Sequence, residues 1–290
     1  MPIFTFLLGK RTTLRHLRLG IMDSVALDTF MSVITPECFG ELETMDIWAR
    51  GDTAAFSKHV ATFPKLKHLN LAKCHQINSL ERALTEKTSI THLALPQIQS
   101  PLEFRFTGDI GRWTMSMSSL RVLRMSPLYL MRSTQPVRLE LDTLELETFQ
   151  SNSIDQNASL QLDCASNIRH IKLSFLGLET KYNRLLVSYI KANRHLKKIT
   201  CAYSEEIVAA LQSPDSSIES IDFLYMPRRM APVMEMLNKC PSLNRINIPP
   251  VCVIDSVVQQ YGSFQHCPNS KLYHYFRVVD SNTNNNVCCA

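Results

Sequence analysis

Cysteine and histidine are the residue types in this chain that are best able to do chemistry, and the sequence contains nine of each. A thiol enzyme needs its cysteine within hydrogen-bond reach of a base, usually a histidine. A zinc site needs cysteines and histidines at short spacings such as C-x-x-C. The sequence contains no C-x-x-C and no spacing that sets a cysteine against a histidine. We therefore expect neither a catalytic thiol nor a metal site.

Four histidines occupy equivalent places in short repeated phrases, namely His16, His68, His92 and His170. Two imidazoles on neighbouring strands are able to bind a metal ion or to respond to pH near neutrality. Other copies of the phrase carry different polar residues at this place, namely Thr44, Thr143, Lys198 and Arg245. We therefore interpret the place as a polar surface position, and we expect His68 and His92 to be neighbours there.

Other sequence motifs of catalysis and anchoring are missing or incomplete. The phrase "TGDIGR" at Thr107 lacks the spacing and the lysine of a phosphate-binding loop. Neither G-x-S-x-G nor H-E-x-x-H occurs. The C-terminal "CCA" resembles a prenylated tail, but the position four from the end is Val287 instead of cysteine. We predict no cofactor, no lipid anchor and no enzymatic activity.

The composition indicates a globular protein, because 45% of the 290 residues are hydrophobic and 20% are charged. The net charge of +5 is spread along the chain without a run of five basic residues, so we do not expect nucleic-acid binding. No segment reaches the roughly 18 apolar residues of a membrane helix. Several cysteines lie among apolar residues and are expected to be free thiols in a reducing compartment, cytoplasmic or nuclear: Cys74, Cys164, Cys201, Cys240 and Cys252.

The elements that position these residues are indicated by the phrase "LKHLNL", whose leucine spacing fits neither a long helix nor a simple hairpin. Similar hexapeptides, with Ile, Met, Phe or Cys in some of the leucine places, begin at ten positions: Leu14, Leu42, Leu66, Ile90, Leu120, Leu141, Ile168, Leu196, Ile218 and Leu243. Successive copies are 21 residues apart at the closest (Leu120 to Leu141) and 30 at the farthest (Ile90 to Leu120). This period is typical of leucine-rich repeats.

A short strand over the last four residues of each hexapeptide explains the spacing. Alternate side chains of a strand point to opposite faces, so Leu69 and Leu71 should point inward while His68 and Asn70 point outward. Leu66 precedes the strand and can point into the same core. One repeat cannot bury these residues alone, so neighbouring repeats must stack. We therefore predict an α/β leucine-rich repeat solenoid, or horseshoe, with a parallel sheet on its concave side and helices and irregular loops on its convex side.

The segments between the hexapeptides show helical periodicity in six places: 24–34, 54–63, 77–87, 182–193, 204–212 and 231–239. Ser204 is expected to cap its helix, since acidic residues follow in the first turn. Pro64 and Pro241 are expected to end helices before the next strand begins. The segments 96–119 and 128–140 are poor in helix signals, and we expect loops or extended chain there.

The predicted organisation has four parts. Residues 1–13 form an N-terminal cap or a truncated start, and residues 14–250 form a solenoid of about ten repeats. Residues 251–280 form a C-terminal cap, with a last helix over 251–264 and a capping strand over 271–279. Residues 281–290 are expected to form a disordered tail, because they are mainly polar.

Two cysteine phrases carry a family resemblance. Cys74 follows a strand by a few residues in "LKHLNLAKCHQI", and Cys240 opens a C-P-x-L sequence that leads into the next strand in "LNKCPSLNRINI". Residues 14–249 thereby resemble the cysteine-containing leucine-rich repeats of F-box proteins, although no F-box is visible. The resemblance implies the substrate-recognition part of an SCF-type ubiquitin ligase, with a Skp-type adaptor as a partner if an F-box exists upstream.

One outward position of each hexapeptide, between the last two core residues, defines a row along the sheet: Arg18, Asp46, Asn70, Ala94, Arg124, Glu145, Lys172, Thr200, Asp222 and Asn247. Charges of both signs alternate in this row, which disfavours a phosphate backbone and suits a protein surface. Trp and Arg are enriched in binding hot spots. We predict that a protein ligand on the concave face contacts Trp48, Arg124, Glu145, Lys172, Tyr203 and Tyr225.

These observations favour a non-catalytic, intracellular protein–protein interaction scaffold. A regulator similar to ribonuclease inhibitor, which binds one enzyme tightly, is the first alternative. An enzyme is the second alternative, and it would require turnover on a broad substrate panel.

Overall fold

The computed structural model describes the backbone of most of the repeat region and of two C-terminal strands. The described residues are 13–23, 25, 27, 29–30, 39–50, 59–74, 84, 89–97, 110, 114, 117–131, 133, 135–148, 162–163, 165–175, 186–187, 189–191, 193–212, 216–224, 239–240, 242–248, 264–266 and 273–276. The chain divides into two units, unit 1 over Met1–Ile168 and unit 2 over Arg169–Ala290. Each unit is described by itself.

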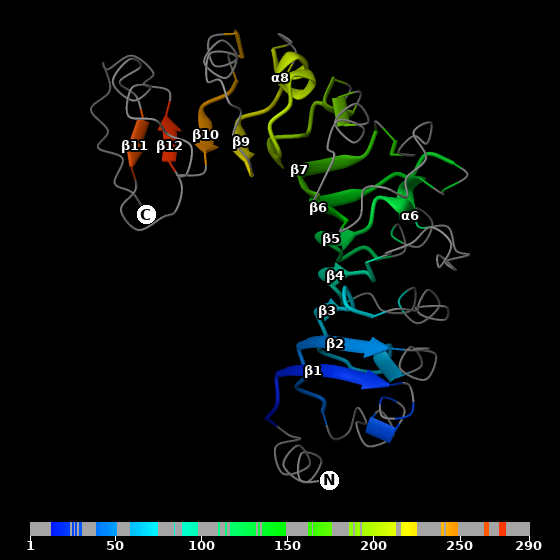
Figure 1. Ribbon diagram of the computed structural model, residues 1–290. Coiled ribbons are helices and arrows are strands. Elements are labelled where there is room, and N and C mark those ends of the chain that lie inside the picture. Colours follow the sequence, from blue (N-terminus) through cyan, green and yellow to red (C-terminus); the bar gives the residue numbers. More distant parts are fainter. Residues whose placement is uncertain are drawn as a thin grey trace. The chain divides into compact units, whose positions relative to one another are not determined.

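Unit 1 is built on an open parallel sheet whose strands follow one another in the order of the chain (Figure 1). Each strand pairs with the next in parallel. The strands are β1 (His16–Asp23), β2 (Thr44–Arg50), β3 (His68–Asn70), β4 (His92–Ala94), β5 (Val122–Met125) and β6 (Glu140–Thr148). All six coincide with predicted hexapeptides, although β1, β2 and β6 extend further than the predicted four residues.

Unit 2 repeats this arrangement with four parallel strands and adds an antiparallel pair. The parallel strands are β7 (Asn167–Phe175, whose first two residues belong to unit 1), β8 (Lys198–Cys201), β9 (Ser220–Phe223) and β10 (Arg245–Ile248). Antiparallel to β10 runs β12 (Tyr273–Phe276), and β12 pairs in turn with β11 (Phe264–His266).

In each unit the leucine spacing serves a shared core, as the sequence predicted. Leu66, Leu69 and Leu71 are 0%, 2% and 0% exposed, whereas the intervening His68 is exposed. The register places the middle leucine of each hexapeptide beside its equivalent in the next, as in the pairing of Leu69 with Leu93. In unit 2 the equivalent residues are isoleucines, all 0% exposed: Ile171, Ile199, Ile221 and Ile246.

A regular backbone contact fixes this register from one hexapeptide to the next. The carbonyl of Glu43 accepts hydrogen bonds from the amides of Lys67 (2.9 Å) and His68 (3.0 Å) of the following copy. The carbonyl of Lys197 in unit 2 accepts in the same way from Glu219 and Ser220. Because the same two amides meet the same carbonyl each time, a slip by one residue would break these bonds and turn core side chains outward.

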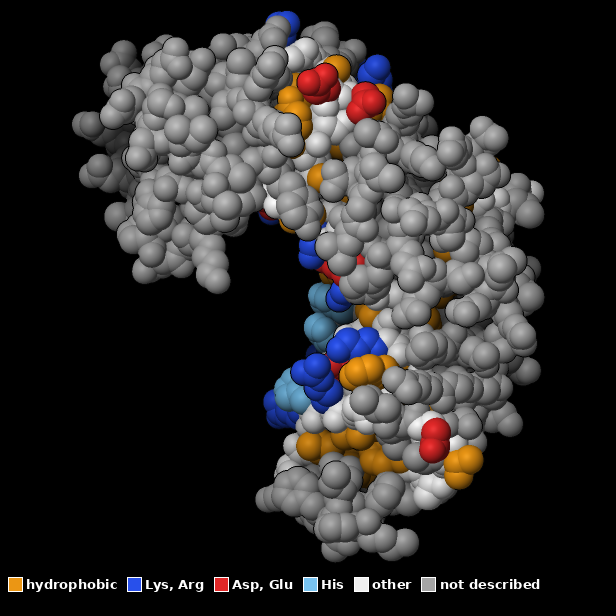
Figure 2. Space-filling view, in the orientation of Figure 1, with side chains coloured by type: hydrophobic (Ala, Val, Ile, Leu, Met, Phe, Trp, Pro, Cys, Tyr) orange, Lys and Arg blue, Asp and Glu red, His pale blue; other side chains and the backbone are white. Residues whose placement is uncertain are grey.

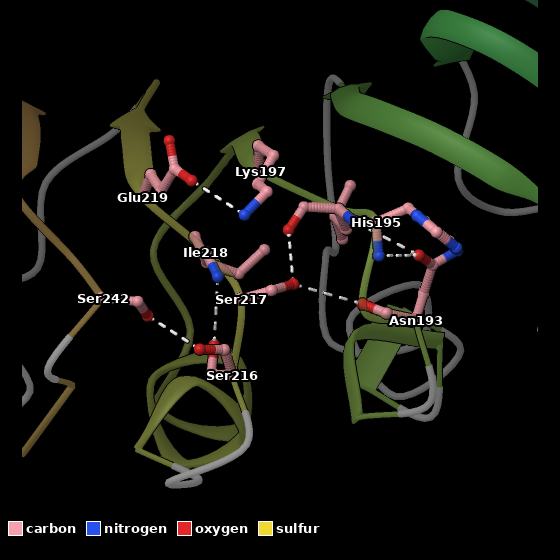
Figure 3. Close-up of polar contacts among 9 residues, drawn as sticks. Asn193, His195, Lys197, Ser216, Ser217, Ile218, Glu219 and Ser242 are labelled. Carbon is pink, nitrogen blue, oxygen red and sulfur yellow. Dashed lines mark hydrogen bonds and ion pairs between the residues drawn. The ribbon is translucent and has the colours of Figure 1, made fainter.

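Side chains also join the turns of consecutive copies in unit 2 (Figure 3). Asn193 Oδ1 accepts from the amides of His195 (2.8 Å) and Leu196 (3.2 Å), which closes the turn before β8. The hydroxyl of Ser217 donates to the Leu196 carbonyl (2.8 Å), and Ser242 donates to the Ser216 carbonyl (2.7 Å). These bonds satisfy partly buried carbonyls in the turns between the strands.

The helix predictions between the hexapeptides are confirmed for most of the residues that the structure describes in those segments. Helix α8 (Glu205–Leu211) begins where expected, and the Ser204 hydroxyl accepts from the amide of Ile207 (3.5 Å). Residues described within 24–34, 77–87, 182–191 and 231–239 are helical, as are residues 59–60. Residues 61–63 and Asn193 are not helical, so the predicted helices 54–63 and 182–193 were wrong at those residues. The short helical piece over residues 59–60 ends before Pro64, as predicted.

The expectation of a loop or extended chain over 128–140 was wrong for its first four residues, which form helix α6 (Leu128–Met131). Pro127 presets a helical φ at the first position, and the Ser126 hydroxyl accepts from the amide of Leu128 (3.4 Å). The carbonyl of Pro127 then accepts from the amide of Met131 (3.0 Å). One turn of helix is too short to show a periodic pattern, so periodicity could not reveal it.

The C-terminal strand prediction is confirmed by β12, but the predicted helix over 251–264 was wrong at its last residue. Phe264 begins strand β11 instead. Residues 251–263 lie outside the described part of the chain. The antiparallel pairing of β12 with β10 ends the succession of parallel strands in unit 2.

Three of the cysteines predicted to be free are confirmed as buried free thiols: Cys74, Cys201 and Cys240. Cys74 Sγ donates to the carbonyl of Ile47 (3.4 Å), and Cys240 Sγ donates to the carbonyl of Leu211. Burial raises the pKa of the Cys74 thiol to about 11. These thiols therefore help to hold neighbouring repeats together. The equivalent predictions for Cys164 and Cys252 lie outside the described residues.

Candidate functional site

The row predicted from the sequence is in register in each unit, although Thr200 and Asn247 in unit 2 are buried instead of exposed. In unit 1 the register pairs Arg18 with Asp46, Asp46 with Asn70, and so on through Ala94, Arg124 and Glu145. In unit 2 it aligns Lys172, Thr200, Asp222 and Asn247. We call these the central row of unit 1 and the central row of unit 2. A second row in unit 1, the histidine row, lies two residues earlier and contains His16, Thr44, His68, His92, Val122 and Thr143.

A hollow of about 300 Å³ lies on this face of unit 1 and opens to solvent. Ala94 has the smallest side chain in the central row, and it lies between Asn70 and Arg124, which are longer. Because the Ala94 side chain is so short, a depression remains between the side chains of its two neighbours. Its lining comes from five adjacent strands and consists of Thr44, Met45, Asp46, His68, Leu69, Asn70, His92, Leu93, Ala94, Val122, Arg124 and Glu145.

The rings of His68 and His92 stack on one side of the hollow, with centroids 4.1 Å apart and planes 8° from parallel. The two residues are register partners on β3 and β4, as the sequence predicted. Figure 2 shows histidine side chains (pale blue) beside lysine and arginine side chains (blue) on this part of unit 1. Burial is the main cause that lowers the pKa of His68, and the charges of His92, Lys67 and His16 lower it further.

Arg124 bounds the other side of the hollow and is held by two carboxylates of β6. Its guanidinium pairs with Glu147, and its Nε lies 4.0 Å from Glu145 Oε2. Gln97 Nε2 also donates to Glu147 Oε2 (2.6 Å). The guanidinium is thus fixed in place, because planar, multiply bonded arginines lose their freedom of orientation. Arg124 and Glu145 are two of the predicted contact residues, and the structure places them side by side.

Trp48 lies two residues beyond Asp46 on β2 and is partly exposed, but it does not line the hollow. The Nζ atom of Lys73, on the turn after β3, lies 4.9 Å from the centre of the Trp48 ring. This distance is that of a cation–π contact. Trp48 was predicted from its residue type, whereas Lys73 was not predicted, because the sequence of the turn after β3 does not indicate where the lysine side chain points.

In unit 2 a hydrogen-bonded network crosses the central row. The Thr200 hydroxyl donates to Asp222 Oδ2 (3.2 Å), and Lys198 Nζ lies 2.6 Å from the same oxygen. His170 Nε2 lies 2.9 Å from the Thr200 hydroxyl oxygen. A hydroxyl has one proton, so Nε2 of His170 must supply the proton of this second bond. The histidine therefore does not activate Thr200 as a nucleophile, and the network links β7, β8 and β9.

Among the remaining predicted contact residues, Lys172 lies on β7 and belongs to the central row of unit 2. Tyr203, also in unit 2, is partly exposed and packs edge-on against Phe223, with ring centroids 5.7 Å apart. Burial raises the pKa of Tyr203, and Glu205 raises it further. Tyr225 lies outside the described residues.

The sequence located the outward positions of His68, His92 and Ala94 but did not select them as contact residues. The selection favoured the large side chains that dominate hot spots. The sequence did hold a signal for the hollow, since alanine occurs once in the central row of unit 1, among polar and charged residues. A small residue in such a row predicts a depression.

The described residues contain no group of three or more His, Cys, Asp or Glu placed to hold a metal ion. Within the same part of the chain, no helix has both the length and the apolar character needed to cross a bilayer.

No family model matches the chain, and no curated protein has significant sequence similarity to it.

Proposed function

We propose that the protein is a non-catalytic interaction scaffold, and that the outward face of unit 1 binds a protein ligand at the hollow around Ala94. The observation that carries the proposal is the in-register central row, which presents charged and polar side chains of both signs around an open depression. A depression of this size receives one or two side chains of a partner.

The electrostatics of the face suit a folded protein better than a polyanion. Arg18 Nε lies 3.3 Å from Asp46 Oδ2, and Arg124 pairs with Glu147. Opposite charges therefore alternate at short range, which gives a partner a specific pattern to match. A phosphate backbone would meet the carboxylates of this row as well as its arginines.

The extent of the face also supports the proposal. Six strands at a spacing of about 4.8 Å span roughly 24 Å, which is enough for a protein interface of ordinary size. Strands place the outward side chains on a rigid framework, so the face can be complementary to its ligand before binding occurs.

The ligase version of the proposal rests on the resemblance to cysteine-containing repeats, and the cysteine contacts are consistent with that resemblance. Cys74 and Cys240 each donate to a carbonyl of the preceding repeat, which is a structural reason for a cysteine at these places in both phrases. On this version the bound ligand is a substrate for ubiquitination, and a Skp-type adaptor is the second partner.

The test uses two alanines as a matched pair. Ala94 lies in the hollow, whereas Ala209 is exposed on α8. We expect Ala94→Trp to fill the hollow and to weaken ligand binding at least tenfold, and Ala209→Trp to leave binding unchanged. The measurement is quantitative mass spectrometry of proteins retained by each purified variant, followed by calorimetry with the isolated ligand.

Retention of the same proteins by both tryptophan variants would overturn the proposal. The presence of a Skp-type adaptor among proteins retained by wild type and by both variants would support the ligase version, since an F-box contact would not depend on the hollow. A stoichiometric enzyme that loses activity when bound would instead support the inhibitor alternative.

A further inference from the structure

The stacked histidine pair has a property that neither ring would have alone. His68 and His92 lie on adjacent strands with their rings nearly parallel and 4.1 Å apart. Two imidazolium ions at this distance repel each other, so the first proton disfavours the second. A first proton on the pair is therefore repelled less than a second one.

The hydrogen bonds of His92 indicate where an added proton would go. The Thr91 hydroxyl donates to the carbonyl of Lys67 (3.3 Å), and its oxygen lies 2.9 Å from Nδ1 of His92. With its proton directed to the carbonyl, the hydroxyl oxygen is an acceptor for Nδ1–H. The Nε2 atom of His92 is then the nitrogen that is free of hydrogen and able to be protonated.

The carboxylates around the pair are already matched by arginines of this chain. Asp46 on β2 faces Arg18 of β1, and Glu43, before β2, lies 3.8 Å from Arg15. On the other side, Glu145 and Glu147 of β6 share Arg124 of β5. Lys67 and His16 add positive charge on the pair's own side of the face.

These surroundings decide which ligand group completes the site. Burial lowers the pKa of His68, the charges of His92, Lys67 and His16 lower it further, and Glu43 offsets them only in part. A carboxylate from outside would supply the missing charge. A continuous phosphate backbone would cross Asp46 and Glu145 along the same row, so a single side-chain carboxylate fits the face better.

We infer that the His68–His92 pair binds a carboxylate of an acidic segment in the protein ligand, and that binding takes up one proton and tightens as pH falls. The inference rests on the proposed function, because it names the partner chemistry of the same hollow. The sign follows from linkage: a carboxylate raises the pKa of the pair in the complex, so the complex holds more protons than the free protein.

The probe is an eight-residue glycine–serine peptide, blocked at both ends, with two central glutamates, and its twin has glutamines instead. Histidine ring signals of the labelled full chain are followed by NMR between pH 5.5 and 7.5. We expect the glutamate peptide to bind roughly tenfold more tightly at pH 5.5 than at pH 7.5. A tenfold change corresponds to a rise of about one unit in the pKa of the pair on binding. The glutamine twin should show no such dependence.

Variants separate the pair from other histidines. His68→Gln and His92→Gln should each remove most of the pH dependence, whereas His195→Gln, at an exposed turn of unit 2, should retain it. Both substituted histidines of the pair are exposed, so folding should survive, and the spectra of the remaining residues check this point.

Three results would overturn the inference: no binding of the glutamate peptide at pH 5.5, an unchanged pH dependence in His68→Gln, or tighter binding of a single-stranded oligonucleotide than of the peptide. Each leaves the interaction scaffold standing if Ala94→Trp still abolishes ligand retention. Conversely, the peptide could bind in a pH-dependent way while Ala94→Trp still retains the protein ligand. That outcome would contradict the proposed binding of a protein ligand at the hollow but not the inference about the histidine pair.

Discussion

At the scale of single residues, Cys74 shows how a repeat pattern becomes a physical constraint. Its thiol is 2% exposed and donates to the Ile47 carbonyl of the preceding repeat. Replacing the thiol with a larger group would overpack the space between the two copies, and removing it would leave a carbonyl without that donor.

Cys74 predicts a loss of stability in alkaline solution. The folded pKa is about 11, whereas the ordinary value is 9.0, so the unfolded thiol ionises first as pH rises. The contribution is complete below pH 9 and should fall by roughly 2 kcal/mol by pH 10.5. Denaturant titrations of wild type and Cys74→Ala at pH 7.5 and 10.5 measure it, because the variant lacks this ionisation. An equal loss in both proteins would contradict the assignment to Cys74.

The sequence was informative at the residue scale because strand alternation is strict. It placed Arg124 and Glu145 side by side and His68 beside His92, and the register agrees. It did not predict that Glu147 would join Arg124 or that Lys73 would reach Trp48. Those contacts depend on long side chains and on the direction of turns, which hydrophobic spacing does not encode.

At the scale of elements, helix α8 owes its start to Ser204. The hydroxyl accepts from the amide of Ile207, and Glu205 and Glu206 lie in the first turn. Both features satisfy or complement the free amides at a helix start.

Loss of this cap should destabilise α8 locally. We expect Ser204→Ala to cost about 1 kcal/mol, which corresponds to roughly fivefold faster hydrogen exchange of the α8 amides. Ser204→Thr keeps a hydroxyl at the same place and should exchange nearly as wild type. Exchange measured by mass spectrometry on peptides covering residues 204–212 tests this, and equal protection in the alanine variant would show that packing alone fixes the helix start.

Elements with a strong periodic signal were predicted well, and those without one were not. The four-residue helix α6 and the strand β11 escaped prediction because they are short and belong to no copy of the hexapeptide. Strands β3 and β4 are equally short, but the repeat revealed them. Helix α8 was predicted because three signals agreed: the N-cap serine, the acidic residues of the first turn and the apolar spacing.

At the scale of the whole molecule, each unit is held together by contacts between consecutive repeats. Leu69 meets Leu93, and Ile221 meets Ile246, through the same register position. Stability in such an arrangement is a sum of local terms, so damage should spread to neighbouring strands and weaken with distance along the chain.

Two core substitutions test this locality. Leu69→Ala and Ile221→Ala each remove a buried side chain and should cost about 2–5 kcal/mol. We expect Leu69→Ala to speed hydrogen exchange in β2, β3 and β4 far more than in β8 and β9, and Ile221→Ala to do the reverse. A uniform acceleration in both variants would indicate a single cooperative fold instead.

The alternation of inward leucines with outward polar residues separates two kinds of information in the same hexapeptide. Asn70, Ala94 and Arg124 can change without disturbing Leu69, Leu93 or Leu123, because neighbouring residues of one strand face opposite sides. Such a surface is open to evolutionary retargeting, and to laboratory libraries randomised at those three codons, at little risk to folding. The protein can thus acquire new ligands through a handful of substitutions while its framework stays the same.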